Sequence, residues 1–202
     1  MINSMTSTIY PHSFFSVAIG LALTLAAPVF AQNNKATADA KCPAVLQHTV
    51  ERLQDEKPQN LCQYAGQVVV VVNTASFCGF TPQYKGLEEL HARYKDKGLV
   101  VLGFPSNDFS QEPGNNQKIA DFCENTYGVK FPMFSKTSVR GQDASPLFKQ
   151  LTQLTDTAPK WNFYKYLISR DGKQVKSFNS TTDPMSVKFL AEIDKQLSAK
   201  LP

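Results

Sequence analysis

The feature that most constrains the fold is the run of five valines from Val68 to Val72, which leads into NTASFCGFT. A short β-branched run of this kind predicts a strand buried on both faces, from Val68 to Asn73. The run ends in small and polar residues that present Cys78. A helix is predicted directly afterwards, over PQYKGLEELHARYKDKG, with Gly98 as its stop. The sequence therefore predicts a lone thiol between a buried strand and the start of a helix.

The later elements follow in an order typical of a mixed sheet. A second strand is predicted over Leu99 to Phe104, then a turn-rich loop, and then a helix that contains Cys123 and ends at Gly128. A short helix in SPLFKQLTQL, a hairpin in FYKYLISRDGKQVKSF and a last helix opened by Asp183 and Pro184 complete the chain. A parallel pair joined by a right-handed crossover, followed by a hairpin, predicts an α/β thioredoxin-like fold. Its mixed central sheet is flanked by helices on both faces.

The first 31 residues form a candidate signal peptide. Residues 14–30 are apolar and uncharged, and Val29 and Ala31 are small residues at the two positions that a signal peptidase reads. Cleavage after Ala31 would export the protein to the periplasm or the medium, with no stable membrane span. A retained membrane anchor is the alternative, although the apolar stretch is short for one. Residues 32–62 are then an N-terminal extension, and residues 63–202 form the main domain.

Charge and cysteine content narrow the functional classes. The formal net charge is +4 with scattered basic residues, which argues against nucleic-acid binding. The chain has no CxxC and few histidines, so neither a metal site nor a bound cofactor is expected. Cys42, Cys62, Cys78 and Cys123 allow three pairings, between which the residues alone do not choose. The segment VLQHTVERL, between the first two cysteines, has helical spacing and predicts a helix.

The position of Cys78 suits a reactive thiol. Peptide N–H groups and the dipole at a helix start stabilise a thiolate. A buried structural cysteine is the alternative, since free cysteines are among the most buried residues. A dithiol oxidoreductase would carry a second cysteine three residues on, where this chain has Thr81. Any resolving thiol must therefore come from elsewhere in the chain or from outside it.

Four motifs, in order, resemble those of the glutathione peroxidase family in its cysteine-containing form. They are NTASFCGFTPQY, FPSNDFSQEPGNN, FCENTYGVKFPMF and KWNFYKYLISRDGK, and the resemblance spans roughly residues 60–193. It implies a peroxidatic Cys78 in a catalytic tetrad with Gln111, Trp161 and Asn162. An amide and an indole N–H can donate hydrogen bonds to a thiolate or to a departing oxygen.

The sequence departs from the family pattern in the loop before Gln111. Many relatives have Cys-Asn-Gln-Phe-Gly where this chain has Ser-Asn-Asp-Phe-Ser over residues 106–110, and the loop is one residue shorter. A carboxylate of Asp108 close to the sulfur would oppose ionisation of the thiol.

The resemblance also assigns roles to the other cysteines. Cys123 stands where two-cysteine, thioredoxin-dependent members carry a resolving cysteine; a buried thiol on a helix face is the alternative. Cys42 and Cys62 precede the family core, and we expect a structural disulfide between them in an exported protein. The short linker TQLTDTAPK implies a monomer.

The expected function is an exported thiol peroxidase that reduces hydrogen peroxide and organic or lipid hydroperoxides. The reductant would be a thioredoxin-like protein or glutathione, and the internal resolving cysteine favours the former. The first alternative is a thiol–disulfide oxidoreductase or redox sensor that acts on partner proteins. The second is a binding module in which Cys78 is inert.

Overall fold

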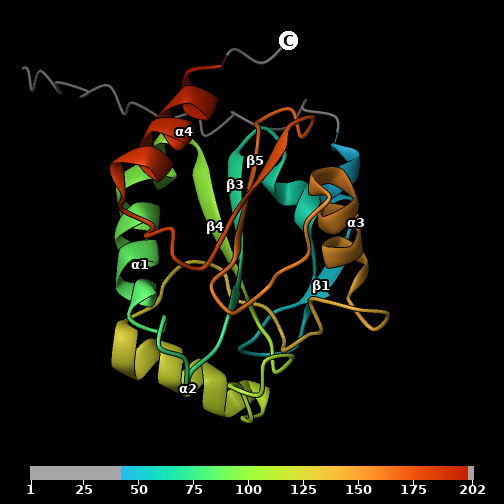
Figure 1. The fold of residues 1–202 in the computed structure, drawn as a ribbon, viewed down its shortest axis with the longest axis vertical. Coiled ribbons are helices and arrows are strands. Elements are labelled where there is room, and N and C mark those ends of the chain that lie inside the picture. Colours follow the sequence, from blue (N-terminus) through green and yellow to red (C-terminus); the bar gives the residue numbers. More distant parts are fainter. Residues whose placement is uncertain (1–41, 200–202) are drawn as a thin grey trace, which may run out of the picture. The chain divides into compact units, whose positions relative to one another are not determined.

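The computed structural model describes residues 42–199 (Figure 1). Its strands are β1 (Thr49–Glu51), β2 (Pro58–Asn60), β3 (Val68–Thr74), β4 (Leu99–Pro105), β5 (Lys165–Ile168) and β6 (Val175–Phe178). Its α-helices are α1 (Gln83–Tyr94), α2 (Asn116–Tyr127), α3 (Pro146–Thr155) and α4 (Val187–Ser198). Three short 3-10 helices are η1 (Ala44–Leu46), η2 (Leu61–Tyr64) and η3 (Lys95–Lys97).

The central sheet has the order β4-β3-β5-β6. β3 and β4 are parallel and are joined through α1, whereas β5 is antiparallel to β3 and to β6. Gly98 follows η3 with φ of +91°, a left-handed conformation that ends the helical segment and turns the chain into β4. The predicted mixed sheet of a thioredoxin-like fold is confirmed.

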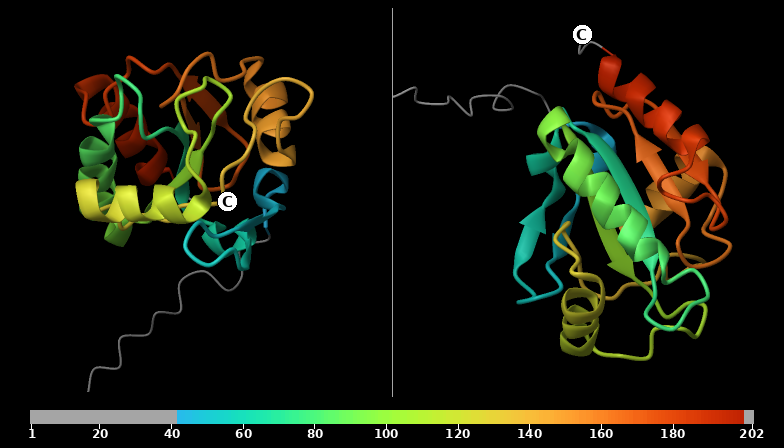
Figure 2. Two further views of the ribbon diagram at one scale, coloured as in Figure 1. Left: turned by 90° about the horizontal axis from the view of Figure 1, so that it is seen from below. Right: turned by 90° about the vertical axis from the view of Figure 1, so that its left-hand side faces the viewer.

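The five valines lie in the middle of the sheet because both of its faces are covered. Val68, Val70 and Val72 pack with α1, α2 and α4, whereas Val69 and Val71 pack with α3 and the N-terminal segment. Figures 1 and 2 show α1 and α4 on one face, α3 on the other, and α2 across the end of the sheet. Full burial of each valine stabilises the fold by about 1.5–3 kcal/mol.

The helix predicted in VLQHTVERL is wrong, since this segment forms η1 and the strand β1. β1 pairs antiparallel with β2, with Thr49 opposite Asn60. The chain beyond it also bonds to a distant segment, because Leu53 N–H donates to the Met133 carbonyl. These backbone partners outweigh the local helical periodicity.

The start of the last helix was also predicted wrongly. Asp183 does not cap α4: its carboxylate accepts the N–H of Met185 at 2.7 Å, and its carbonyl accepts the N–H of Ser186 at 3.1 Å. These bonds close a turn ahead of the helix, which begins at Val187. The turn motif uses the aspartate that the sequence had assigned to the helix.

The predicted signal peptide and its cleavage point lie outside the described residues. Over residues 42–199, no helix has the length and hydropathy that a membrane crossing requires.

Candidate active site

Cys78 lies in a succession of turns between β3 and α1. Its Sγ accepts a hydrogen bond from the backbone N–H of Phe80 at 3.4 Å. Its own N–H donates to Thr81 Oγ1 at 3.0 Å, and that hydroxyl donates to the Ala75 carbonyl at 3.0 Å. Thr81, at the position of the missing second cysteine, therefore fixes the turn. A peptide N–H that donates to sulfur interacts more strongly with a thiolate than with a thiol.

The sequence predicted that the sulfur of Cys78 lies at the start of a helix. In the structure it does not contact the start of α1 directly. α1 begins only at Gln83, because the Thr81 N–H bonds to the Cys78 carbonyl and closes a turn first. The N–H that reaches the sulfur thus belongs to this turn and not to the helix. Cys78 is also only 8% exposed, so little of the residue is open to solvent.

Gln111 and Asn162 meet through their side chains. Asn162 Nδ2 donates to Gln111 Oε1 at 2.9 Å, and Asn162 is fully buried. The carbonyl of Gln111 also accepts the N–H of Phe77 at 3.1 Å, which ties the loop to the turn of Cys78. The oxygen of the Gln111 amide accepts this bond, which orients the amide. Its NH₂ group remains available to donate to a reacting group.

Trp161 lies at the surface and is 42% exposed. Its ring packs against Phe109 with centroids 5.3 Å apart, and its carbonyl accepts from Asn73 Nδ2 at 3.1 Å. Within residues 42–199, the bond from Phe80 is the only hydrogen bond that the sulfur of Cys78 makes. The structure thus joins Gln111 to Asn162, and places neither these two nor Trp161 in hydrogen-bond contact with the sulfur.

The carboxylate of Asp108 forms its hydrogen bonds with another loop and not with Cys78. It accepts the backbone N–H groups of Val139 at 2.6 Å and Arg140 at 3.1 Å. The acid beside the turn is instead Glu112, whose carboxylate accepts the N–H of Ser76 at 2.7 Å and its hydroxyl at 2.8 Å. Burial raises the pKa of Glu112. Glu112 directly follows Gln111 in the sequence, but no pattern in the sequence marks it as part of the site.

Cys123 lies on the buried face of α2 and is 3% exposed. Its Sγ donates a hydrogen bond to the hydroxyl of Tyr84 at 3.5 Å, and burial raises its pKa to about 11. Cys78 and Cys123 are both free thiols in the structure. Cys42 and Cys62 are joined by a disulfide, with Cα atoms 5.2 Å apart.

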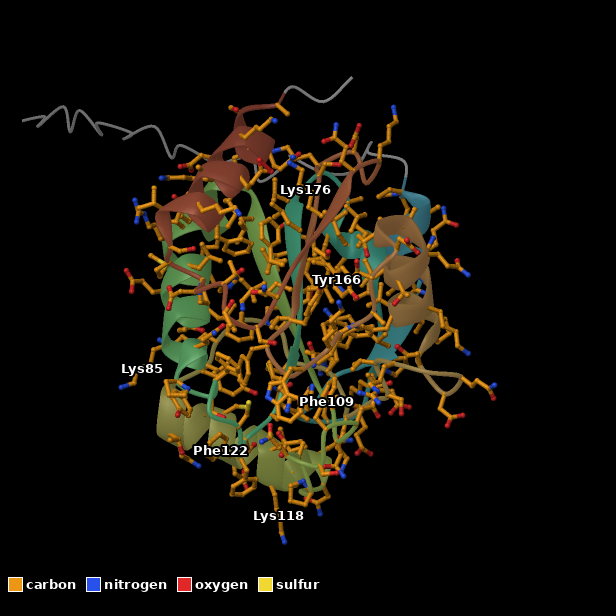
Figure 3. The ribbon with its side chains drawn as sticks, in the orientation of Figure 1. Lys85, Phe109, Lys118, Phe122, Tyr166 and Lys176 are labelled. Carbon is orange, nitrogen blue, oxygen red and sulfur yellow. A yellow bond between two sulfur atoms is a disulfide. The ribbon has the colours of Figure 1, made fainter. Side chains whose placement is uncertain are left out.

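A pocket of about 390 Å³ opens beside the turn of Cys78. Phe77, Ile119 and Phe122 give it an apolar wall, and Glu112 and Lys118 lie at its polar side. Phe77 is 68% exposed and stacks on Phe122 of α2, with ring centroids 6.4 Å apart. Figure 3 shows Phe122, Lys118 and Phe109 at the same end of the molecule. The Cys78 end of the sheet thus carries both polar donors and an apolar surface.

Comparisons with known proteins agree with this arrangement. The sequence profile described as "Glutathione peroxidase" matches residues 46–152. A glutathione peroxidase-like peroxiredoxin of Chlamydomonas reinhardtii is 50% identical over 139 residues, which are 66% of this chain and 85% of that protein. A hydroperoxy fatty acid reductase of Synechocystis is 46% identical over 154 residues, which are 71% of this chain and 90% of that protein.

The fold agrees as well. The crystal structure of Trgpx in its apo form has a TM-score of 0.64 and 37% sequence identity, and the match covers 80% of this chain and 100% of that one. The fold, the cysteine-bearing turn at the end of β3 and the similarity over most of the chain lead to one conclusion. This chain belongs to the glutathione peroxidase family and is an oxidoreductase, a peroxidase of the cysteine type.

Proposed function

We propose that this protein is an exported two-cysteine thiol peroxidase that reduces hydrogen peroxide and organic or lipid hydroperoxides. The observation that carries the proposal is the turn of Cys78: Phe80 N–H donates to its sulfur. Through Phe77, the same turn is bonded to Gln111, which in turn contacts Asn162. A thiol with a fixed peptide donor and a nearby amide pair suits attack on a peroxide bond.

The first step uses Cys78. Its thiolate attacks one oxygen of the hydroperoxide, the O–O bond breaks, and the other oxygen leaves with a proton as water or alcohol. Cys78 becomes a sulfenic acid. The NH₂ of Gln111 and the indole N–H of Trp161 are the proposed donors to the departing oxygen. Neither donates to the sulfur in the structure, so both side chains would have to move.

The second and third steps regenerate the enzyme. The thiol of Cys123 condenses with the sulfenic acid, so that a disulfide forms and water leaves. Because Cys123 is buried on α2 and bonded to Tyr84, part of this helix has to unwind first. A thioredoxin-like dithiol protein then reduces the disulfide by thiol exchange. Glutathione is the alternative reductant.

The proposed substrate range rests on the pocket beside the turn. Its apolar wall of Phe77, Ile119 and Phe122 can contact the organic part of a bulky hydroperoxide. The Synechocystis relative is named a hydroperoxy fatty acid reductase, which supports the same class of substrate. We also propose that the protein acts as a monomer, which leaves this surface open.

Export is proposed from the N-terminal sequence. The apolar segment over residues 14–30 and the small residues before Gln32 have the pattern of a cleaved signal peptide. The Cys42–Cys62 disulfide suits an oxidising compartment. Fractionation of the native host should place the protein in the periplasm or the medium, with Gln32 as its first residue. Recovery of the uncleaved chain in the membrane fraction would contradict the proposal.

The test of the cycle is a steady-state peroxidase assay with thioredoxin and glutathione supplied separately. We expect turnover with thioredoxin, and we expect a Cys123→Ser variant to lose it. Turnover with glutathione alone that the Cys123→Ser variant keeps would overturn the two-cysteine cycle. Failure of the wild type to consume any peroxide, with disulfide exchange on a protein substrate retained, would identify a thiol–disulfide oxidoreductase instead.

A further inference from the structure

A buried lysine, Lys165, lies on β5 beside the candidate site and has no role in the proposed cycle. The residue is fully buried, and it is paired in the sheet with Val72 on one side and Phe178 on the other. Its Nζ donates to the side-chain oxygen of Gln83 at 2.6 Å and to the carbonyl of Phe163 at 2.7 Å. Both acceptors are uncharged, and in the described part of the chain Lys165 forms no ion pair.

This arrangement is costly for stability. Lysine is almost never fully buried unless a charged partner accompanies it. Burial lowers the pKa of Lys165 to about 7, and the carboxylate of Asp183 opposes this shift only from beyond ion-pair distance. An apolar side chain of similar length would fill the same space without this cost. A reason for the buried amino group must therefore lie in the two groups to which it donates hydrogen bonds.

The first group that it holds belongs to a strained segment. Phe163 has φ of +61°, a left-handed conformation that a bulky residue adopts only when its surroundings enforce it. Its N–H donates to the carbonyl of Asn73, and its own carbonyl accepts from Lys165. Asn73 also donates to the Trp161 carbonyl and accepts from the Tyr164 N–H. The segment that carries Trp161 and Asn162 is thus fastened by two polar side chains.

The second group belongs to the other half of the site. Gln83 is the first residue of α1, and its N–H donates to the Phe80 carbonyl at 2.9 Å. Phe80 is the residue whose N–H donates to the sulfur of Cys78. One amino group therefore connects the turn of Cys78, through Gln83, with the segment of Trp161 and Asn162, through Phe163.

We propose that Lys165 is a positioning residue, which holds the Trp161–Asn162 segment in register with the turn of Cys78 through its bonds to Phe163 and Gln83. The inference rests on the proposed function, because the register matters for the attack of Cys78 on a peroxide. Loss of the amino group releases the strained turn at Phe163 and lets Trp161 and Asn162 move. A displacement of about 1 Å at such a site lowers a rate by as much as about a hundredfold.

The test compares Lys165→Met with Lys176→Met. Lys176 lies on the neighbouring strand β6, pairs with Glu192 at the surface, and lies away from the labelled Phe109 and Phe122 in Figure 3. Trp161 is the only tryptophan, so its fluorescence reports directly on the segment. At a temperature well below unfolding, Lys165→Met should make Trp161 more accessible to acrylamide. It should also slow single-turnover oxidation of Cys78 about tenfold or more. Lys176→Met should change neither.

A second variant keeps the test decisive if Lys165→Met does not fold. Gln83→Met, at a half-buried position, removes the acceptor for Lys165 and also the bond that Gln83 Nε2 donates to the Ser180 carbonyl. Loss of the bond to Lys165 should slow Cys78 oxidation about fivefold. Unchanged fluorescence and unchanged oxidation in a folded Lys165→Met variant, or in Gln83→Met in its place, would overturn the proposal. If the wild type fails to react with peroxide, the proposed function fails, and the fluorescence comparison still decides whether Lys165 positions the segment.

Discussion

Cys123 is protected from reaction by its surroundings in the folded protein. It is packed on the inner face of α2 against Tyr84, and burial raises its pKa to about 11. A free cysteine has a pKa near 8.5, and only the thiolate is an effective nucleophile. In the proposed cycle, Cys123 therefore becomes reactive only after α2 has opened, which separates the peroxide step from the resolving step.

The rate at which Cys123 is alkylated tests this protection. In a Cys78→Ser variant, Cys123 should react with iodoacetamide far more slowly at pH 7–8 than a small thiol does, because its thiolate fraction is low. The raised pKa means that the rate should keep increasing as the pH approaches 11. Mass spectrometry of quenched samples measures it. Alkylation at pH 7 as fast as that of the unfolded variant would show that Cys123 is not sequestered.

Individual residues show which contacts of the site could be predicted from the sequence and which could not. Gln111 and Asn162 belong to motifs that lie far apart in the chain, and the family resemblance placed both in one site. Their side chains do contact each other, but no local sequence pattern predicts this contact. The sequence left open whether Asp108 lies near the sulfur; in the structure the backbone N–H groups of Val139 and Arg140 donate to its carboxylate. Such partners come from loops whose mutual placement the sequence does not encode locally. Lys165 could have been noticed, since a charge in the middle of a buried strand is unusual.

Among the helices and strands, α2 is the element that has to move in the proposed cycle. It is fixed at its start by Asn115, whose side chain accepts the N–H of Lys118, and at its end by Gly128 in the left-handed conformation. Phe122 of α2 is half-buried against the core, and its ring contacts those of Phe77 and Tyr127, with centroids 6.4 and 5.6 Å apart. These aromatic contacts oppose local opening of the helix.

We therefore expect Phe122→Ala to accelerate the resolving step. Each aromatic pair contributes about 0.5–1.5 kcal/mol, so loss of both lowers the cost of opening by about 1–3 kcal/mol. Disulfide formation after Cys78 is oxidised should therefore be faster by about fivefold or more. Rapid mixing with one equivalent of peroxide, followed by acid quench and mass spectrometry, measures it. Phe178→Ala is the matched control, because it removes a ring contact with Phe189 of α4 and none with α2. A resolving rate that Phe122→Ala leaves unchanged or slows would contradict the idea that these contacts limit opening.

The elements also show where sequence patterns succeed and fail. The valine strand, α1, α2, α3 and the β5–β6 hairpin agree closely with their patterns, because their apolar spacing reflects their own buried faces. The N-terminal segment does not, since β1 is stabilised by β2 and by the chain near Met133. Pairing across a long sequence separation leaves no periodic signal in a strand of three residues.

At the scale of the whole molecule, residues 42–62 pack against the main core, and the disulfide closes a loop within this segment. Val45, Leu46 and Leu61 pack with Val69 and Val71 on the face covered by α3. Cys42 and Cys62 join the two ends of this segment across 20 residues. Residues 42–62 are therefore part of the folded core, and their contribution to stability is separate from the chemistry at Cys78.

We expect the double variant Cys42→Ser, Cys62→Ser to be less stable by about 3 kcal/mol, because the unfolded chain regains the freedom of that loop. Urea unfolding under non-reducing conditions measures the change. The rate of Cys78 oxidation should stay the same at temperatures where the variant is folded. A large loss of peroxide reactivity without a loss of stability would show that this disulfide acts in catalysis.

The central claim is that Cys78 is the residue that peroxide oxidises. The most direct measurement is a single turnover with one equivalent of hydrogen peroxide, in which the oxidation state of each cysteine is read by mass spectrometry. The account predicts that the wild type and Cys123→Ser oxidise Cys78 at the same initial rate, and that Cys123→Ser stops at the sulfenic acid or beyond it. Cys78→Ser should consume no peroxide. Oxidation that begins at Cys123 in the wild type and persists in Cys78→Ser would contradict the account.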